Sequence, residues 1–93
     1  MVRVIFRLRG RVQGVGYRDH VCERAHRYAI AGSVRNAAGE AALVIDVEGE
    51  PVEVERFLAD VLANGPAAAR VDSVERSPAA PLGRKAFQRE PST

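Results

Sequence analysis

Apolar residues alternate with mostly basic residues at the start of the chain, and a second apolar pattern with a helical period follows. The alternating apolar positions are Val2, Val4, Phe6 and Leu8. A period of two is typical of a strand with one buried face, so it predicts a strand over residues 2–9. The helical positions are Val21, Cys22, Ala25, Tyr28 and Ala29. Their spacing predicts a helix over residues 17–29.

The middle of the chain is expected to form a hairpin. A short strand over residues 30–36 is followed by a tight connection over residues 37–40 and by a strand over residues 41–48. The second of these strands carries Leu43, Ile45 and Val47 on one face.

A second helix and two C-terminal strands complete the expected elements. Pro51 suits the first turn of a helix, and Asn64-Gly65-Pro66 ends it. The expected buried stripe of this helix is Val54, Phe57, Leu58, Val61 and Leu62. A strand over residues 69–76, a loop over 78–83 and a short edge strand over 85–88 with Phe87 inward follow. Residues 90–93 are expected to form a frayed tail.

This order is βαββαβ with one short terminal strand. It predicts an α+β, ferredoxin-like split βαβ fold, in which two helices cover one face of a mainly antiparallel sheet of four or five strands. In this topology the strands at 2–9 and 30–36 both pair with the strand at 41–48, and they are parallel to each other. Their C-terminal ends therefore meet at one edge of the sheet, about 10 Å apart.

Composition narrows the class of protein. A chain of 93 residues is long enough for a single domain over residues 1–93. A lone cysteine cannot form an internal disulfide, and no targeting segment is apparent, so we expect a cytoplasmic monomer without membrane contact. The 14 basic residues are interleaved with 12 acidic ones, which argues against a nucleic-acid-binding surface.

Glycine is concentrated in the segment between the first strand and the first helix, at Gly10, Gly14 and Gly16. A loop of this kind can aim several N–H groups at one anion, and a helix start adds the positive end of its dipole. Arg18 follows with a planar, permanently charged group suited to phosphate oxygens. The segment matches neither the P-loop nor the Gly-x-Gly-x-x-Gly pattern. Taken alone, it predicts either an oxyanion site or a simple glycine-rich turn.

The sequence Gly-Arg-Val-Gln-Gly-Val-Gly-Tyr-Arg at 10–18 resembles the signature of the acylphosphatase family. Ala-Gly-Ser-Val-Arg-Asn at 31–36 resembles the second motif of that family, at the expected distance. Further matches are Phe57-Leu58, Gly65-Pro66 and residues 69–74. The resemblance covers residues 3–87, which is nearly the whole chain.

The resemblance implies hydrolysis of acyl phosphates to carboxylate and phosphate, with no metal and no cofactor. It implies that Arg18 binds the phosphoryl group and that Asn36 orients the attacking water. The backbone N–H groups that it implies for the phosphate cradle, where inorganic phosphate or sulfate would also bind, belong to Gln13, Gly14, Val15, Gly16, Tyr17 and Arg18.

The sequence departs from the family pattern at four places, and none of them replaces a residue with an implied role in the reaction. Tyr17 stands where phenylalanine is more usual, Ser33 replaces a frequent aromatic residue, and Ala67 replaces a common proline. The connection at 37–42 is rich in alanine where the family often has an Asp-Gly turn.

Other reactive side chains are expected to be structural. Cys22 lies on the apolar stripe of its helix and is expected to pack as a small hydrophobic residue. His20 and His26 are expected at the surface. The first turns of this helix also contain acidic residues, Asp19 and Glu23, which favour its dipole. Asp46, Glu48 and Glu50 have no histidine or cysteine partners, so no transition-metal site is expected.

Two non-catalytic functions share the predicted topology. An RNA-binding module would need aromatic residues on its central strands, and the strand at 41–48 has none. A small-molecule regulatory domain usually serves a fused enzyme or an oligomer. Related domains also occur inside larger carbamoyl-transfer maturation proteins. We expect a stand-alone enzyme that acts on a small acyl phosphate.

Overall fold

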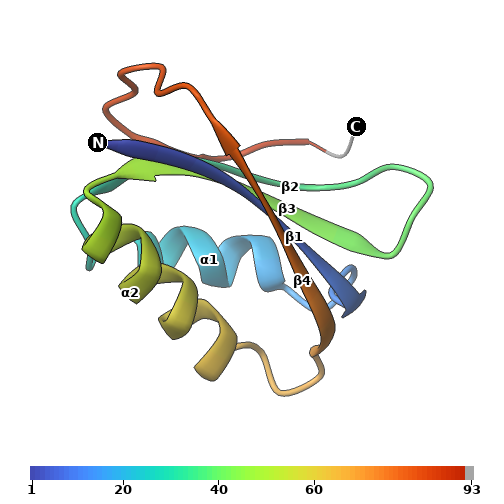
Figure 1. The fold of residues 1–93 in the computed structure, drawn as a ribbon. Coiled ribbons are helices and arrows are strands. Elements are labelled where there is room, and N and C mark those ends of the chain that lie inside the picture. Colours follow the sequence, from blue (N-terminus) through green and yellow to red (C-terminus); the bar gives the residue numbers. More distant parts are fainter. Residues whose placement is uncertain (92–93) are drawn as a thin grey trace.

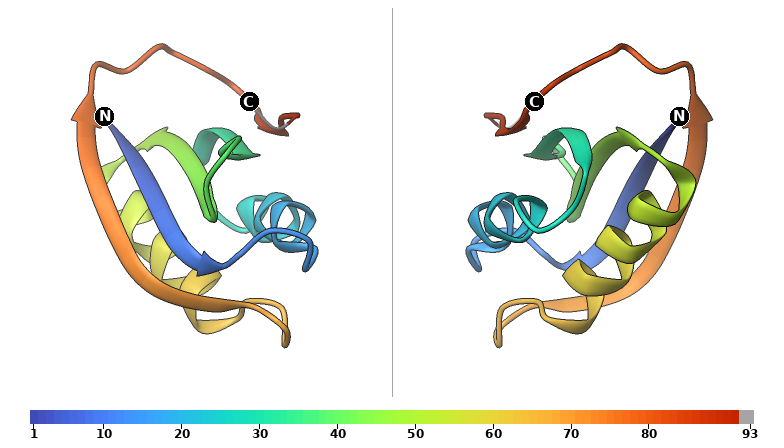
Figure 2. Two further views of the ribbon diagram at one scale, coloured as in Figure 1. Left: turned by 90° about the vertical axis from the view of Figure 1, so that its right-hand side faces the viewer. Right: turned by 90° about the vertical axis from the view of Figure 1, so that its left-hand side faces the viewer.

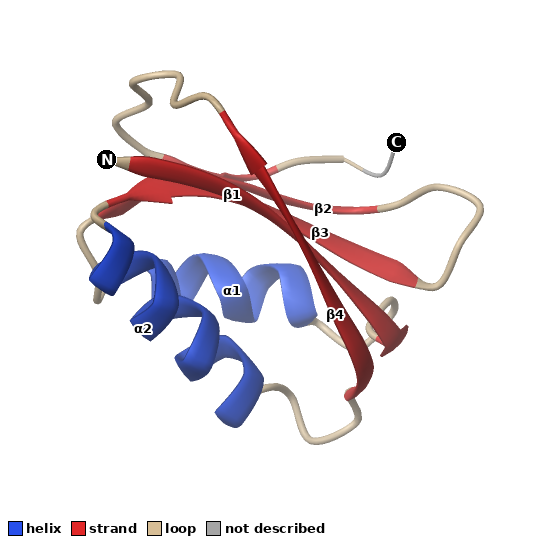
Figure 3. Ribbon diagram, in the orientation of Figure 1, coloured by secondary structure: helices blue, strands red, loops and turns tan. Residues whose placement is uncertain are grey.

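Two helices pack against one face of a five-stranded sheet (Figures 1 and 3). The computed structural model describes residues 1–91. The elements are β1 (Val2–Arg11), α1 (Tyr17–Ala25), β2 (Ile30–Asn36), β3 (Ala42–Gly49), α2 (Pro51–Ala63), β4 (Arg70–Ala79) and β5 (Phe87–Arg89). The predicted α+β, ferredoxin-like arrangement is confirmed, with the fifth strand included.

The strand order in the sheet is β4-β1-β3-β2-β5. All neighbours are antiparallel except β2 and β5, which are parallel. Leu8 of β1 and Asn36 of β2 lie opposite the same residue of β3, Leu43. The C-terminal ends of β1 and β2 therefore meet at one edge of the sheet, as the topology predicts.

The core lies between the sheet and the helices, as the end-on views show (Figure 2). The alternating residues of β1 and β3 supply its sheet side, and the apolar stripes of the helices supply the other. Its largest fully buried apolar side chains include Phe6, Leu8, Tyr17, Leu43, Ile45 and Phe57. Phe87 of β5 packs inward against Phe57, with ring centroids 5.4 Å apart, as predicted.

Helix α1 ends at Ala25, four residues before its predicted end. The backbone N–H groups of Arg27 and Tyr28 donate to the carbonyls of Arg24 and Ala25, so the last turn tightens into i→i−3 hydrogen bonds. Tyr28 still packs against the core from this turn. The periodic pattern therefore continued past the point where the backbone left the α-helix.

The predicted stripe of α2 is wrong at one position. Leu62 is 37% exposed, whereas Asp60 is buried. The carboxylate of Asp60 accepts hydrogen bonds from Arg24, Tyr28 and Asn64, so its burial is compensated.

Strand β2 has its predicted bounds, whereas the ends of the other strands differ by a few residues from the prediction. β1 continues to Arg11 through a bulge at Gly10, where an added Cβ would lie 2.1 Å from the carbonyl oxygen of Arg70. β4 runs on past Pro78, which an edge strand tolerates. β3 and β5 are shifted toward the C-terminus.

The predicted frayed tail is wrong at its start, because Glu90 donates its N–H to the carbonyl of Val34 at 2.8 Å. Ser92 and Thr93 lie outside the described residues. Across residues 1–91, no helix has the length and apolar character needed to span a membrane.

The lowered pKa of Asp60 predicts that the free energy of unfolding decreases at acidic pH. Burial alone would raise its pKa, but the hydrogen bonds from Tyr28, Arg24 and Asn64 outweigh burial and lower the pKa from 3.8 to about 2. A lowered pKa stabilises the fold above pH 3.8, and that contribution is lost as the pH falls toward 2.

We expect Asp60→Asn to lower the free energy of unfolding by roughly 1–2 kcal/mol at pH 7, with allowance for solvent screening. The difference between wild type and variant should shrink below pH 4. Urea titrations at a series of pH values measure this, and a difference that stays constant down to pH 2 would contradict it.

Candidate active site

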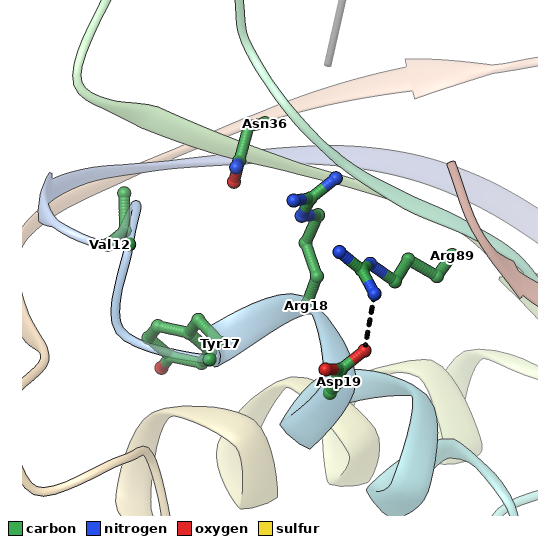
Figure 4. Close-up of a pocket in the computed structure, with 8 residues that line it drawn as sticks. Val12, Tyr17, Arg18, Asp19, Asn36 and Arg89 are labelled. Carbon is green, nitrogen blue, oxygen red and sulfur yellow. Dashed lines mark hydrogen bonds and ion pairs between the residues drawn. The ribbon is translucent and has the colours of Figure 1, made fainter. Parts of the chain in front are cut away.

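A small pocket opens at the edge of the sheet where β1 and β2 end (Figure 4). Its volume is about 120 Å³. It is lined by Val12, Gly14, Gly16, Tyr17, Arg18, Asp19, Asn36 and Arg89. The structure thus brings the 10–18 loop and Asn36 together at one place, as the topology predicts.

The loop from β1 to α1 depends on two glycines in the left-handed region. Gly14 has a φ of 72° and Gly16 a φ of 78°. An added Cβ would meet nothing within 4 Å at either position, so the backbone conformation, not space, requires glycine there. Gly16 is also the N-cap of α1, and no side chain caps the helix.

The amides of this loop are left without acceptors. Within residues 1–91, no N–H group of residues 13–18 donates a hydrogen bond, and the first helical bond runs from the N–H of His20 to the carbonyl of Gly16. N–H groups at a helix start that lack acceptors favour an anion. Val12, the first residue after β1, is fully buried and anchors the loop in the core.

The side chain of Gln13 fastens the loop to the β2–β3 connection. Its Nε2 lies 2.9, 2.7 and 2.9 Å from the carbonyl oxygens of Ala37, Glu40 and Ala42, so its two hydrogens are shared among three acceptors. Sequence reasoning considered only the backbone N–H of Gln13. The side chain joins the glycine-rich loop to the segment that directly follows Asn36.

Arg18 projects into the pocket from the first turn of α1 (Figure 4). Its Nη1 donates to the backbone carbonyl of Glu90 at 3.0 Å. This acceptor is neutral, so the full positive charge of the guanidinium remains available to an anion.

Arg89 lines the same pocket and was missed by the sequence reasoning. Its Nη1 donates to Oδ1 of Asp19 at 3.0 Å. Asp19 thus does more than favour the helix dipole. The signal was available: Arg89 lies two residues beyond the inward-facing Phe87 and therefore shares its face of β5.

Asn36 is the last residue of β2 and is only 8% exposed. Its Oδ1 is buried and accepts no hydrogen bond from the described part of the chain. Buried amide oxygens nearly always have a donor, so this atom is available to a donor that enters the pocket.

His20 is half-buried, so its predicted surface position is wrong. Its Nε2 is buried and has no hydrogen-bond partner within residues 1–91. The ring packs edge-on against Tyr17, with centroids 6.0 Å apart, and the Tyr17 hydroxyl donates to the carbonyl of Val61. Position 20 therefore follows the buried side of the helix. His26 is exposed, as predicted.

Cys22 packs partly buried against the core, as predicted. Burial and the nearby charge of Asp19 raise the pKa of its thiol, although Arg89 opposes this. A raised pKa leaves less thiolate at neutral pH, and Cys22 does not line the pocket.

The acidic residues of β3 have arginine partners. Asp46 accepts hydrogen bonds from Arg3 and Arg84, and Glu48 accepts from Arg84. Glu50 is exposed, 4.0 Å from the terminal amine. Among residues 1–91, no three histidine, cysteine or acidic side chains form a group that could hold a metal ion.

Known proteins resemble this chain along most of its length. The model of the Acylphosphatase family matches residues 4–89. The acylphosphatase of Synechococcus sp. (strain RCC307) is 40% identical over 90 residues, which is 94% of this chain and 73% of that protein. The acylphosphatase of Rhodospirillum rubrum is 35% identical over 92 residues, which is 99% of each chain.

Solved structures agree with the sequence matches. The crystal structure of acylphosphatase from Bacillus subtilis superposes with a TM-score of 0.88 at 27% identity and covers 97% of this chain and 99% of that one. Full-length HypF in a phosphate- and nucleotide-bound form gives a TM-score of 0.90 at 30% identity. That match covers 98% of this chain but only 12% of HypF, a much longer protein.

The contacts of Gln13 predict how the loop responds to substitution. Gln13→Ala removes the donor to three carbonyls and should lower the free energy of unfolding by about 1 kcal/mol. Gln13→Glu should lower it further, because a carboxylate oxygen would face carbonyl oxygens with no proton between them. Urea unfolding measures the order of stability of wild type, Gln13→Ala and Gln13→Glu. The control is the same glutamine-to-glutamate change at Gln88, which is exposed on β5. Equal stability of the two Gln13 variants would contradict this account.

Proposed function

Since this chain belongs to the acylphosphatase family and is an enzyme that hydrolyses acyl phosphates, we propose that it does so without a metal ion, through Arg18, Asn36 and the amides of residues 13–18. One observation carries this proposal. A guanidinium with a neutral partner, N–H groups without acceptors and a buried amide oxygen without a donor meet in one small pocket.

In this proposal the phosphoryl group lies in the cradle of the 13–18 loop. The N–H groups and the dipole of α1 bind its oxygens, and Arg18 adds a charged, forked donor. Phosphoryl transfer needs orientation and fixed positive charge more than covalent help from the protein. Arg18 and the loop amides supply the positive charge. The paired strands β1 and β2 supply the orientation, because they hold the loop and Asn36 at one edge of the sheet.

Asn36 orients the attacking water. Its Oδ1 accepts a hydrogen bond from the water and aims the oxygen at phosphorus, whereas an amide is too weak a base to take the proton. A bond forms from the water oxygen to phosphorus as the bond from phosphorus to the acyl oxygen breaks. The electron pair of that bond leaves with the carboxylate. One proton of the water stays on its oxygen, and the other passes to another phosphate oxygen or to solvent.

A carboxylate is a stable leaving group, so the reaction needs no strong general acid. This agrees with the placement of His20 and Cys22, neither of which lines the pocket. We therefore assign no proton-transfer or nucleophilic role to either side chain.

We further propose that the enzyme works as a cytoplasmic monomer, binds inorganic phosphate in the same cradle and binds no nucleic acid or membrane. Cys22 is the only cysteine, as is usual for a protein of a reducing compartment. Phe6, the one aromatic residue of β1 and β3, is fully buried toward the helices. The open face of these central strands thus lacks a stacking platform for bases.

Chelation tests the metal-free reaction. Hydrolysis of benzoyl phosphate or acetyl phosphate should proceed at the same rate in excess EDTA as in buffer, because every proposed contact comes from the protein. A rate that falls with EDTA and returns with a divalent metal would contradict the proposal.

Substitutions separate the roles of the two side chains. Arg18→Ala should weaken inhibition by inorganic phosphate and lower turnover by at least ~10²-fold, because the cation acts in both the ground state and the transition state. Arg18→Lys should restore little. Asn36→Ala should lower turnover comparably while KM and phosphate inhibition hardly change, since its contact matters once attack begins.

Steady-state kinetics and phosphate inhibition constants measure these effects, and circular dichroism confirms that the variants are folded. A folded Asn36→Ala enzyme that loses phosphate binding as severely as Arg18→Ala would make Asn36 a phosphate ligand and overturn the division of roles.

A further inference from the structure

We propose that Arg89 is a second substrate-binding residue, which contacts a phosphoryl oxygen beside Arg18, and that Asp19 competes with the substrate for it. This inference rests on the proposed role of Arg18. It adds a cation from the C-terminal strand to a site otherwise built from the 10–18 loop and β2.

The position of Arg89 follows from the parallel pairing of β5 with β2. Arg89 lies opposite Val34 in the register, two residues before Asn36 at the end of β2. Phe87 and Arg89 share a face of β5, and Phe87 anchors that face in the core against Phe57. The next inward position therefore carries its side chain to the N-terminal end of α1, where the pocket lies.

The guanidinium group of Arg89 is positioned to move. Arg89 lines the same pocket as Arg18 (Figure 4), and its guanidinium is joined to Asp19 through Nη1 alone. Its other nitrogens donate to nothing within residues 1–91. The side chains of Arg89 and Asp19 are 49% and 72% exposed. An ion pair this exposed is weak in water, so a doubly charged anion can compete for the arginine.

The charges of the pocket favour this exchange. A phosphoryl group carries between about 1.5 and 2 negative charges near neutral pH. Arg18 offers one positive charge, and the Arg89–Asp19 pair is neutral as a unit. When Arg89 turns from Asp19 to the substrate, two guanidinium groups match the charge of the phosphoryl group, and Asp19 is left to solvent.

Substitutions distinguish an Arg89–Asp19 ion pair that only stabilises the fold from one in which Asp19 competes with the substrate for Arg89. If the pair only fastened β5 to α1, Arg89→Ala and Asp19→Asn would both lower thermal stability and leave substrate binding unchanged. Competition instead predicts opposite effects on binding. Arg89→Ala weakens it, whereas Asp19→Asn releases Arg89 and strengthens it.

The experiment measures KM for benzoyl phosphate and the inhibition constant of inorganic phosphate in Arg89→Ala, Asp19→Asn and the double variant. Arg89→Ala should raise both constants on the order of tenfold, the effect of losing one charged hydrogen bond. Asp19→Asn should lower both several-fold. In the double variant that gain should disappear, because no arginine remains to be released.

Arg56→Ala is the matched control. Arg56 is exposed, pairs with Glu53 at the same 3.0 Å distance and lies on α2, outside the pocket. The Arg56→Ala variant loses one positive charge, one surface ion pair and a contact with the Tyr28 ring, all outside the pocket, so its KM and phosphate inhibition constant should stay within twofold of wild type. Should Arg89→Ala fail to fold, Arg89→Gln and Asp19→Asn still test the binding effects.

Two results would overturn the inference. One is that Arg89→Ala leaves both constants unchanged in a folded protein. The other is that Asp19→Asn strengthens phosphate binding equally with and without Arg89, which would show a general field effect of the carboxylate. Both are distinct from failure of the proposed function, which the Arg18 and Asn36 variants test while Arg89 is intact.

Discussion

A fully buried carboxylate, Glu48 of β3, fixes the path of the chain between β4 and β5. It accepts hydrogen bonds from the N–H groups of Leu82, Gly83 and Arg84 and from Nε of Arg84, at 3.2, 2.7, 3.2 and 2.7 Å. Burial alone would raise its pKa, but these donors together lower it, so the carboxylate stays charged. A buried charge without donors would be very costly, so the 82–84 segment must remain where its amides meet Glu48.

The active site depends on this contact although it lies away from the pocket. Beyond residue 84 the chain pairs with β2, through the N–H of Gly32 to the carbonyl of Ala86 and through the N–H of Glu90 to the carbonyl of Val34. That pairing delivers the Glu90 carbonyl to Arg18 and places Arg89 at the rim of the pocket. The loop after β1, the end of β2 and the end of β5 are thus brought together by one sheet.

The local hydrophobic pattern and the order of the elements were enough to predict much of this architecture. Periods of two and of 3.6 residues located the strands and helices, and the split βαβ order placed the 10–18 loop beside Asn36. The glycines at 14 and 16 were identified correctly as conformational requirements. Their left-handed backbone favours a residue without a Cβ, and the sequence displays glycine at both positions directly.

Two errors at charged residues, the buried Asp60 and the missed Arg89–Asp19 pair, share one physical cause, which is that side chains far apart in sequence are partners. Asp60 is buried because Arg24 and Tyr28 reach it from the end of α1. Asp19 is paired with Arg89, 70 positions away. Periodicity assigns a charged residue to solvent, and only the tertiary structure reveals a partner that changes this.

The partner of Arg18 distinguishes this residue from three arginines that serve the fold. Arg3, Arg24 and Arg84 are joined to carboxylates, so their charges are largely compensated and serve the fold. Arg18 is held by a backbone carbonyl, which fixes its direction without cancelling its charge. Under the proposed mechanism, this combination of a fixed direction and an uncompensated charge lets a small fold stabilise a phosphoryl group without a metal, because little reorganisation remains when the substrate arrives.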